Sequence, residues 1–477
     1  MVKSLKCKEI TNMVEHYDLA VVGAGPGGYV AAIRAAQMGL KTICIDKRET
    51  LGGTCLNVGC IPSKTLLHST DLYSTLKQHG LEQAIEVSDL KVNFTKLMER
   101  KRNVVKGLIE GIALLFKKNG VIYLKGEAQF LDAHTLQVKN GTHIDEIKAN
   151  YILLATGSES TSLPHLPFDE KNIVSSTGAL NLATVPPRLL VIGGGVIGVE
   201  LASVYNRLGS SVTIIEMSDR LCPAMDIALS KYLFQILKKQ GIEIKLSTKM
   251  MTAVLQPNET ILTIEQNEQL QNISGEVVLV AVGRRPYTQG LSLDKVGIQI
   301  DKKGFIPVDG FFRTSQPHIF AIGDLIEGVM LAHRASQEGI TVVEWLKGER
   351  QSINYLAIPN VVYTNPEVAS VGLTEQEASE SGLTLLTGTT YFRGNSRARC
   401  TDEIEGFVKL IGEKKSGRLL GMHIIGAHAS ELIAVGTLAI QKQINLKDLA
   451  ETMQAHPTLS ETIKEAALQA LGKAVHG

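Results

Sequence analysis

Two cysteines five positions apart, Cys55 and Cys60, lie in the stretch LGGTCLNVGCIPSK and are the residues best suited to chemistry. The chain's other four cysteines are isolated: Cys7, Cys44, Cys222 and Cys400. Four interpretations compete for the pair: a structural disulfide, half of a zinc site, two unrelated buried thiols, or a redox-active dithiol. A reducing compartment disfavours the first, and zinc would need a second pair at ligand spacing. The redox dithiol leads, and the buried thiols stay open.

A glycine-rich turn precedes this pair. Residues 17–46 predict strand, turn, helix and strand, with Gly23, Gly25 and Gly28 at the turn. In G-x-G-x-x-G the glycines permit a tight turn, a close pyrophosphate and close helix–strand packing. Asp46 ends the second strand, where a carboxylate can accept hydrogen bonds from a ribose. The segment predicts a dinucleotide site.

The same pattern recurs at residues 188–216. Its glycines are Gly193, Gly195 and Gly198, and Glu216 follows at the same spacing as Asp46 in the first copy. One such motif is weak evidence, but two complete copies predict sites for two different dinucleotides. A carboxylate at Glu216 suits the free 2′-hydroxyl of NAD and repels the 2′-phosphate of NADP.

Composition excludes several classes of partner. Lys and Arg total 49 against 48 Asp and Glu, so no net field favours nucleic acid or an anionic membrane. No apolar run approaches the roughly 18 residues that cross a bilayer. Residues 1–18 have no apolar signal core, so we expect a cytoplasmic protein or one whose presequence is gone. We expect no metal site.

The pattern predicts an α/β protein with two Rossmann-like dinucleotide-binding domains and a third, C-terminal α+β domain. Length alone suggests roughly three units of ordinary domain size. At residues 282–286 and 319–325 the pattern indicates that the chain returns to the first domain, the second time as a strand. The predicted domains are 1–158 with 282–355, 159–281, and 356–477.

Several motifs occur in one order along nearly the whole chain: GGTCLNVGCIPSK, ATGS, AVGRRP, AIGD, MLAH, YTNPEVASVG and AHPTLSE. In this the sequence resembles the dihydrolipoamide dehydrogenase family of class I pyridine nucleotide-disulfide oxidoreductases. The resemblance implies FAD in the first site and NAD in the second. It also implies that residues 356–477 are a dimerisation domain and that the protein is a homodimer.

The resemblance further assigns roles to single residues. Cys60 would be the thiolate beside the flavin, and Cys55 the thiol that exchanges with substrate. Lys64 would lie near the flavin ring and pair with Glu200, which also belongs to the NAD site. The other implied FAD contacts are Gly53, Thr54, Gly126, Thr156, Gly157, Ser158, Asp324, Met330, Leu331, Ala332 and His333. Met250 and Gly283 match positions that line the NAD site.

His456 and Glu461 suit the chemistry of thiol–disulfide exchange. An imidazole can take a proton from an attacking dithiol, and a carboxylate on its other nitrogen fixes the tautomer. By resemblance the histidine serves the disulfide of the other subunit. The sequence departs from the family at Asp46, where glutamate is more usual, and at Gln454, which replaces a frequent histidine.

The predicted reaction is oxidation of protein-bound dihydrolipoamide to lipoamide, with electrons passing through the Cys55–Cys60 disulfide and FAD to NAD⁺. The resemblance implies a shared component of 2-oxoacid dehydrogenase complexes, with a lipoyl domain and an acyltransferase core as partners. Two alternatives stay open. One is a related flavin disulfide reductase that acts on another small disulfide, and the other is a non-catalytic flavoprotein scaffold.

Overall fold

The computed structural model describes residues 15–349 and 352–476, which form two compact units. The first unit contains the described residues up to Thr65, then Thr95–Thr161 and Gly283–Ile353. The second contains Leu66–Phe94, Ser162–Val282 and the chain from Asn354 onward. Residues 1–14, on which the expected compartment depends, lie outside the described part.

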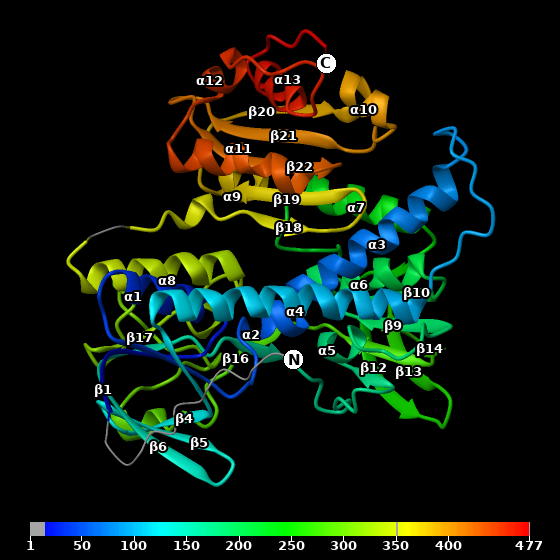
Figure 1. Cartoon of the computed structure of the whole chain (residues 1–477). Helices are drawn as coiled ribbons and strands as arrows, with labels where there is room; N and C mark the ends of the chain where they lie inside the picture. Colours follow the sequence, from blue (N-terminus) through cyan, green and yellow to red (C-terminus); the bar gives the residue numbers. More distant parts are fainter. Residues whose placement is uncertain (1–14, 350–351, 477) are drawn as a thin grey trace. The chain divides into compact units, whose positions relative to one another are not determined.

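A seven-stranded sheet forms the centre of the first unit, in the order β3-β2-β1-β6-β5-β4 with β17 also paired to β6. Figure 1 labels five of these strands: β1, β4, β5, β6 and β17. Strands β3, β2, β1, β6 and β17 pair in parallel, whereas β4, β5 and β6 pair antiparallel. Tyr17, Leu19, Ile43 and Phe130 are fully buried in the core of this unit. The apolar run at residues 19–22 is buried and forms part of a central strand, paired with β2 on one side and β6 on the other.

The elements of the first unit are β1 (Glu15–Val22), α1 (Pro26–Gln37), β2 (Thr42–Asp46), α2 (Gly53–Val58), α3 (Cys60–His79), α4 (Phe94–Asn119), β3 (Ile122–Lys125), β4 (Glu127–Asp132), β5 (Thr135–Asn140), β6 (His143–Leu154), β7 (Ser158–Ser160), β16 (Arg284–Pro286), η1 (Leu293–Val296), β17 (Ile319–Ala321), η2 (Gly323–Leu325) and α8 (Ala332–Leu346), where α3 continues into the second unit and η denotes a 3₁₀ helix.

The second unit contains three sheets. A parallel sheet has the order β11-β10-β9-β15-β8, and an antiparallel sheet has the order β12-β13-β14. The C-terminal part has an antiparallel sheet in the order β18-β19-β22-β21-β20, on which helices α11 and α13 pack (Figure 1). The strands of this C-terminal sheet have one face covered by buried apolar side chains.

The elements of the second unit are β8 (Ile173–Val174), α5 (Ser176–Ala179), β9 (Arg188–Ile192), α6 (Val196–Arg207), β10 (Ser211–Ile215), α7 (Ile227–Lys239), β11 (Glu243–Lys245), β12 (Thr248–Leu255), β13 (Thr260–Gln266), β14 (Gln269–Gly275), β15 (Val277–Val280), η3 (Tyr355–Ala357), β18 (Asn360–Val362), β19 (Glu367–Gly372), α9 (Glu375–Glu380), β20 (Leu385–Tyr391), η4 (Phe392–Gly394), α10 (Ser396–Thr401), β21 (Phe407–Glu413), β22 (Leu419–Gly426), α11 (Ala429–Gln441), α12 (Leu446–Glu451) and α13 (Glu461–Ala470).

The α/β fold class is confirmed, and both predicted strand–turn–helix–strand segments are present. The first is β1-α1-β2 and the second is β9-α6-β10, each with its two strands paired in parallel. The division of the chain into three domains stays a prediction.

Candidate active site

The first glycine turn joins β1 to α1. Gly23 has a φ of +107°, and a Cβ there would lie 2.3 Å from the carbonyl oxygen of Ala155. A Cβ on Gly28 would lie 1.8 Å from the carbonyl oxygen of Gly23, so only glycine lets the helix pack this closely. Gly25 is the N-cap of α1 and makes no side-chain cap hydrogen bond, which leaves N–H groups at this helix end for a phosphate.

The second glycine turn repeats this geometry in the second unit. A Cβ on Gly193 would lie 2.4 Å from the carbonyl oxygen of Ala281, and one on Gly198 would lie 2.0 Å from the carbonyl oxygen of Gly193. Gly195 is the N-cap of α6, again without a side-chain cap, and a Cβ on it would meet no atom within 4 Å. An approaching pyrophosphate needs N–H groups at a helix end that no side chain caps, so both turns fit a dinucleotide.

The carboxylates of Asp46 and Glu216 are held at these turns. Asp46 Oδ2 accepts a hydrogen bond from Ala24 N at 2.7 Å, and Glu216 Oε2 accepts one from Gly194 N at 2.5 Å. The second oxygen of each carboxylate accepts another backbone N–H two residues further along the chain. Each oxygen keeps accepting capacity for a ribose hydroxyl, because a carboxylate has about four lone-pair sites. The shorter Asp46 side chain reaches its turn as Glu216 does.

The cysteine-bearing segment lies directly against the first turn. Gly52 N donates a hydrogen bond to Ala24 O at 2.9 Å. A Cβ on Gly53, whose φ is +58°, would lie 2.5 Å from the Cα of Gly25. At both positions the backbone comes too close to its neighbours for a side chain to fit. This explains the double glycine before the first cysteine. The segment that bears the sulfurs is therefore fixed to the turn that fits a dinucleotide phosphate.

Both sulfurs are thiols in the structure, with Cys55 in α2 and Cys60 as the first residue of α3. A hydrogen bond with the Cys60 side chain, then burial, then the charge on Cys60 raise the pKa of Cys55, while Lys64 acts in the opposite direction. The two side chains interact so closely that their titration belongs to the pair and not to either sulfur alone. A helix N-terminus also favours a thiolate.

Three polar side chains from distant segments meet in the first unit. Ser158 Oγ donates a hydrogen bond to Asp324 Oδ2 at 2.5 Å, and Arg284 Nε donates to Ser158 Oγ at 2.7 Å. Burial lowers the pKa of Arg284, opposed by the charges of Asp324, Cys60 and Glu159. Sequence reasoning named Ser158 and Asp324 but missed Arg284, although the arginine follows Gly283 within the quoted motif AVGRRP.

The remaining implied FAD positions also lie in the first unit. Gly126 N donates to Asp46 O at 2.9 Å, and Thr156 Oγ1 donates to Tyr287 O at 2.6 Å. Thr54 lies in α2, and residues 330–333 include the first two residues of α8. Gly157 has a φ of +73° and open space where a Cβ would lie. Their roles toward a cofactor stay predictions.

The implied NAD positions divide between the units. Glu200 is buried in α6, where its Oε1 accepts a hydrogen bond from Tyr363 N at 3.0 Å, and Met250 lies in β12. Gly283 and Lys64 belong to the first unit. The pairing of Lys64 with Glu200 therefore stays a prediction.

His456 and Glu461 lie in contact as a dyad in the second unit. His456 Nδ1 lies 3.0 Å from Glu461 Oε1, and Thr458 N donates to Glu461 Oε2 at 2.9 Å. The Thr458 hydrogen bond is the main cause that lowers the pKa of Glu461, and His456 adds to it. A charged carboxylate on Nδ1 leaves Nε2 as the proton acceptor, and the imidazole side chain is 69% exposed.

Asn395 lies about sixty residues earlier in the chain and contacts the residues around His456 and Glu461. Its Nδ2 donates to Thr458 O at 2.9 Å and to Thr462 Oγ1 at 3.0 Å. Its Oδ1 accepts from Ala398 N and so caps α10. Sequence reasoning missed Asn395, because no short motif connects it to the histidine.

Asn395→Asp should lower the turnover number about tenfold, because an aspartate still caps α10 but cannot donate to the dyad loop. The measurement is steady-state kinetics with the melting temperature recorded for the same protein. Asn395→Ala, which loses the cap as well, should show the same kinetic defect and a lower melting temperature. A normal turnover number in Asn395→Asp would show that the two donated hydrogen bonds do not position the dyad.

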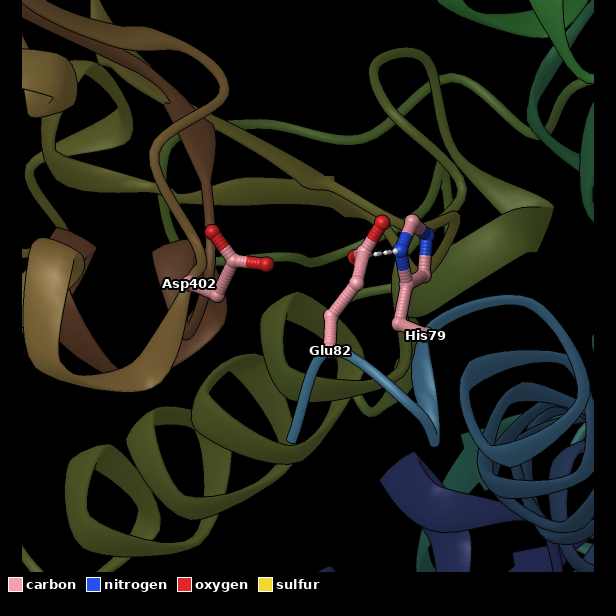
Figure 2. A group of neighbouring side chains, drawn as sticks. All are labelled: His79, Glu82 and Asp402. Atoms are coloured by element: carbon pink, nitrogen blue, oxygen red, sulfur yellow. Dashed lines mark hydrogen bonds and ion pairs between the residues drawn. The ribbon is translucent and has the colours of Figure 1, made fainter. Parts of the chain in front are cut away.

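One group of side chains with metal-ligand chemistry lies apart from these residues. Figure 2 shows His79, Glu82 and Asp402, whose ligand atoms lie within 4.8 Å of one another. All three are exposed, and His79 Nδ1 is already paired with Glu82 Oε2 at 2.8 Å. Exposed acidic groups of this kind are common without an ion, so we assign no metal to them.

Among the described residues, the helices are all too short or too polar to span a bilayer.

Two family models match the chain. Residues 17–339 match the pyridine nucleotide-disulphide oxidoreductase model, and residues 358–467 match the dimerisation domain of the same family. The chain is 49% identical over 463 residues to the dihydrolipoamide dehydrogenase of Chaetomium thermophilum, covering 96% of this chain and 92% of the relative. It is 49% identical over 465 residues to the mitochondrial dihydrolipoyl dehydrogenase of Schizosaccharomyces pombe, covering 96% and 91%.

The fold is also similar to that of solved structures, two of which are LpdA and RclA. LpdA from Mycobacterium tuberculosis superimposes with a TM-score of 0.88 at 27% identity, covering 94% of this chain and 99% of that one. The HOCl-induced flavoprotein disulfide reductase RclA from Escherichia coli gives 0.84 at 27% identity, with coverage of 94% and 99%.

Proposed function

The chain belongs to the pyridine nucleotide-disulphide oxidoreductase family, and from this premise we propose that it is a dihydrolipoamide dehydrogenase. The reaction converts protein-bound dihydrolipoamide and NAD⁺ into lipoamide, NADH and a proton. The observation that carries the proposal is the 49% identity to named dihydrolipoamide dehydrogenases over 96% of the chain. Family membership implies the cofactors FAD and NAD(H).

Cys55 and Cys60 have distinct parts in the proposed exchange. In the oxidised enzyme they form a disulfide, and a substrate thiolate attacks the Cys55 sulfur, which releases Cys60 as a thiolate. The second substrate thiol then displaces Cys55, so lipoamide leaves and two protein thiols remain. The hydrogen bond between the two side chains supports their action as one dithiol. FAD, held at the first glycine turn, would supply the redox chemistry that carries the two electrons of the dithiol to NAD⁺.

His456 is the proposed base. Its Nε2 takes the proton of the attacking substrate thiol, while Glu461 on Nδ1 stabilises the charged imidazolium. The exposed imidazole supports a role toward a substrate or disulfide that another subunit presents. We propose a homodimer in which His456 faces the disulfide of the partner subunit, with the C-terminal dimerisation domain as the interface.

The site assignments of the glycine turns are proposals of the same kind. The first turn with Asp46 would hold FAD, and the second turn with Glu216 would hold NAD. The hydrogen bond from Gly194 N to the Glu216 carboxylate supports this, because a fixed negative charge there disfavours a 2′-phosphate.

Glu216→Gln should reduce the preference for NAD⁺ over NADP⁺ by about tenfold, since the amide keeps an acceptor for Gly194 N but removes the negative charge. Kinetics with the two nucleotides, compared as kcat/KM, measure this preference. The control is Glu268→Gln, which removes an exposed charge from the turn between β13 and β14. Equal preference in wild type and Glu216→Gln would assign nucleotide selection to another residue.

Partners and compartment are separate proposals. We infer service to a 2-oxoacid dehydrogenase complex, through a lipoyl domain as substrate and an acyltransferase core as docking partner. The sequence predicted a cytoplasmic protein. The alternative was a mature protein whose presequence has been removed, as in an organelle. The names of the Schizosaccharomyces pombe and Pisum sativum relatives contain the word mitochondrial and support the organelle. Cell fractionation with an antibody against the chain decides between them.

The test of the proposed function is anaerobic titration of the purified protein with dihydrolipoamide, followed by addition of NAD⁺. We expect flavin absorbance to change with a new long-wavelength band, and NADH to appear in equal amount to lipoamide. Reduced glutathione at the same thiol concentration should produce neither. A response to glutathione alone would favour the related reductase, and a flavin that responds to no dithiol would favour the scaffold.

A further inference from the structure

A buried ion pair on α8 is used by none of the steps described so far. Arg334 and Glu338 are one helical turn apart, and their side chains are 2% and 0% exposed. Arg334 Nε donates to Glu338 Oε1 at 2.7 Å. A buried ion pair is weak evidence for stability, because desolvating the two charges offsets most of their attraction. Its other hydrogen bonds therefore indicate what it does.

Those other hydrogen bonds reach two loops that carry implied flavin contacts. Glu338 Oε2 accepts from Gly323 N at 2.7 Å, which fixes the start of the turn that holds Asp324. Arg334 donates through its two terminal nitrogens to Glu327 O at 2.7 Å and to Val329 O at 2.8 Å. These carbonyls belong to the loop that leads into residues 330–333.

Each of the two loops contains a glycine with a positive φ. A Cβ on Gly328, whose φ is +126°, would lie 2.6 Å from the Arg334 guanidinium. Gly323 has a φ of +65°. Both loops therefore adopt conformations that disfavour other residues, and the ion pair is the element that connects the two.

The same helix is fixed to the first glycine turn. Ser336 Oγ lies 3.3 Å from Pro26 O, and a Cβ on Gly339 would lie 2.6 Å from Gly27 O. Helix α8 thus packs against the first residues of α1, at the end that fits a phosphate. The ion pair therefore lies on a helix that contacts three segments: the Asp324 turn, the loop before α8 and the first glycine turn.

We propose that Arg334 and Glu338 are positioning residues for FAD, which hold the Asp324 turn and the loop before α8 in the conformation that binds the cofactor. Neither side chain is itself a cofactor contact. The inference rests on the proposed flavin site and adds two residues that the family resemblance did not supply.

The test measures FAD affinity and the stability of the apoprotein separately. The double variant Arg334→Met/Glu338→Leu replaces the ion pair by apolar side chains of similar length, which buried pairs often tolerate. We expect the FAD dissociation constant, from flavin fluorescence during reconstitution, to rise about tenfold or more, as the loss of positioning hydrogen bonds implies. The melting temperature of the apoprotein should stay near that of wild type.

The matched control is Arg34→Met, which breaks an ion pair between α1 and Glu344 on the same helix α8 but touches neither loop. Its FAD dissociation constant should equal that of wild type. If the double variant does not fold, Arg334→Lys takes its place, because lysine keeps the charge but cannot bridge Glu338 and both carbonyls. It should bind FAD more weakly than wild type does.

Wild-type FAD affinity in every folded variant of the pair would overturn the proposal. Asp324→Ala separates this failure from failure of the flavin site. Weak FAD binding in Asp324→Ala together with normal binding in the pair variants would reject only the positioning role. Normal binding in Asp324→Ala would reject the proposed flavin contact itself.

Discussion

Cys60→Ser should abolish lipoamide-dependent NADH formation, with a loss of about a thousandfold or more. A single sulfur cannot form the intramolecular disulfide that exchange with a dithiol requires. The serine is nearly isosteric, and the contacts that fix the segment to the first turn are made by glycine backbone, so FAD binding should persist. The measurement is NADH formation from dihydrolipoamide, with flavin content determined on the same sample.

Two further variants, Cys55→Ser and Cys400→Ser, test whether the effect is specific to Cys60. Cys55→Ser should lose turnover too, but it keeps the sulfur that takes the negative charge and should show the long-wavelength band without added reductant. Cys60→Ser should lack that band. Cys400 is exposed on α10, so Cys400→Ser should behave as wild type. Undiminished turnover in Cys60→Ser would remove the central step of the proposed reaction.

His456→Gln should lower lipoamide turnover by about a hundredfold to ten-thousandfold, the usual contribution of a positioned acid–base group. Glutamine can still hydrogen-bond to Glu461 but cannot take a proton from a thiol. Reduction of an artificial dye by NADH needs no proton transfer to a substrate thiol and should be preserved. Steady-state assays of both reactions on one preparation measure the difference.

His165→Gln is the control, because His165 is an exposed histidine of the second unit outside the dyad. It should leave both reactions unchanged. Equal losses of lipoamide and dye reduction in His456→Gln would indicate a general defect of the protein and contradict the role of His456 as base.

The sequence was most informative where the relevant geometry is local. Three glycines at fixed spacing, followed by a carboxylate 23 residues after the first, predicted both turns, because neighbouring strands and the intervening helix decide that geometry. His456 and Glu461 are five residues apart and meet as expected. In each case a short stretch of chain contains all the contacting groups.

The sequence was least informative where a contact joins distant segments. Arg284 reaches Ser158 across 126 positions, and Asn395 reaches Thr458 across 63. No pattern in the sequence predicts such contacts, because they depend on the tertiary packing of distant segments. Arg334 and Glu338 have the spacing of an ordinary exposed helix pair, and only the structure shows that they are buried.

The first sheet takes its strands from both sides of a long insertion. Strand β6 pairs with β1 near the N-terminus of the described chain and with β17, which follows all of residues 162–282. A nascent chain leaving the ribosome therefore exposes an incomplete first unit until β17 and α8 have been made. Meanwhile the parallel sheet of the second unit already has all its strands. We expect this order to make the early chain a client of chaperones, and FAD to be taken up only after synthesis has passed residue 346.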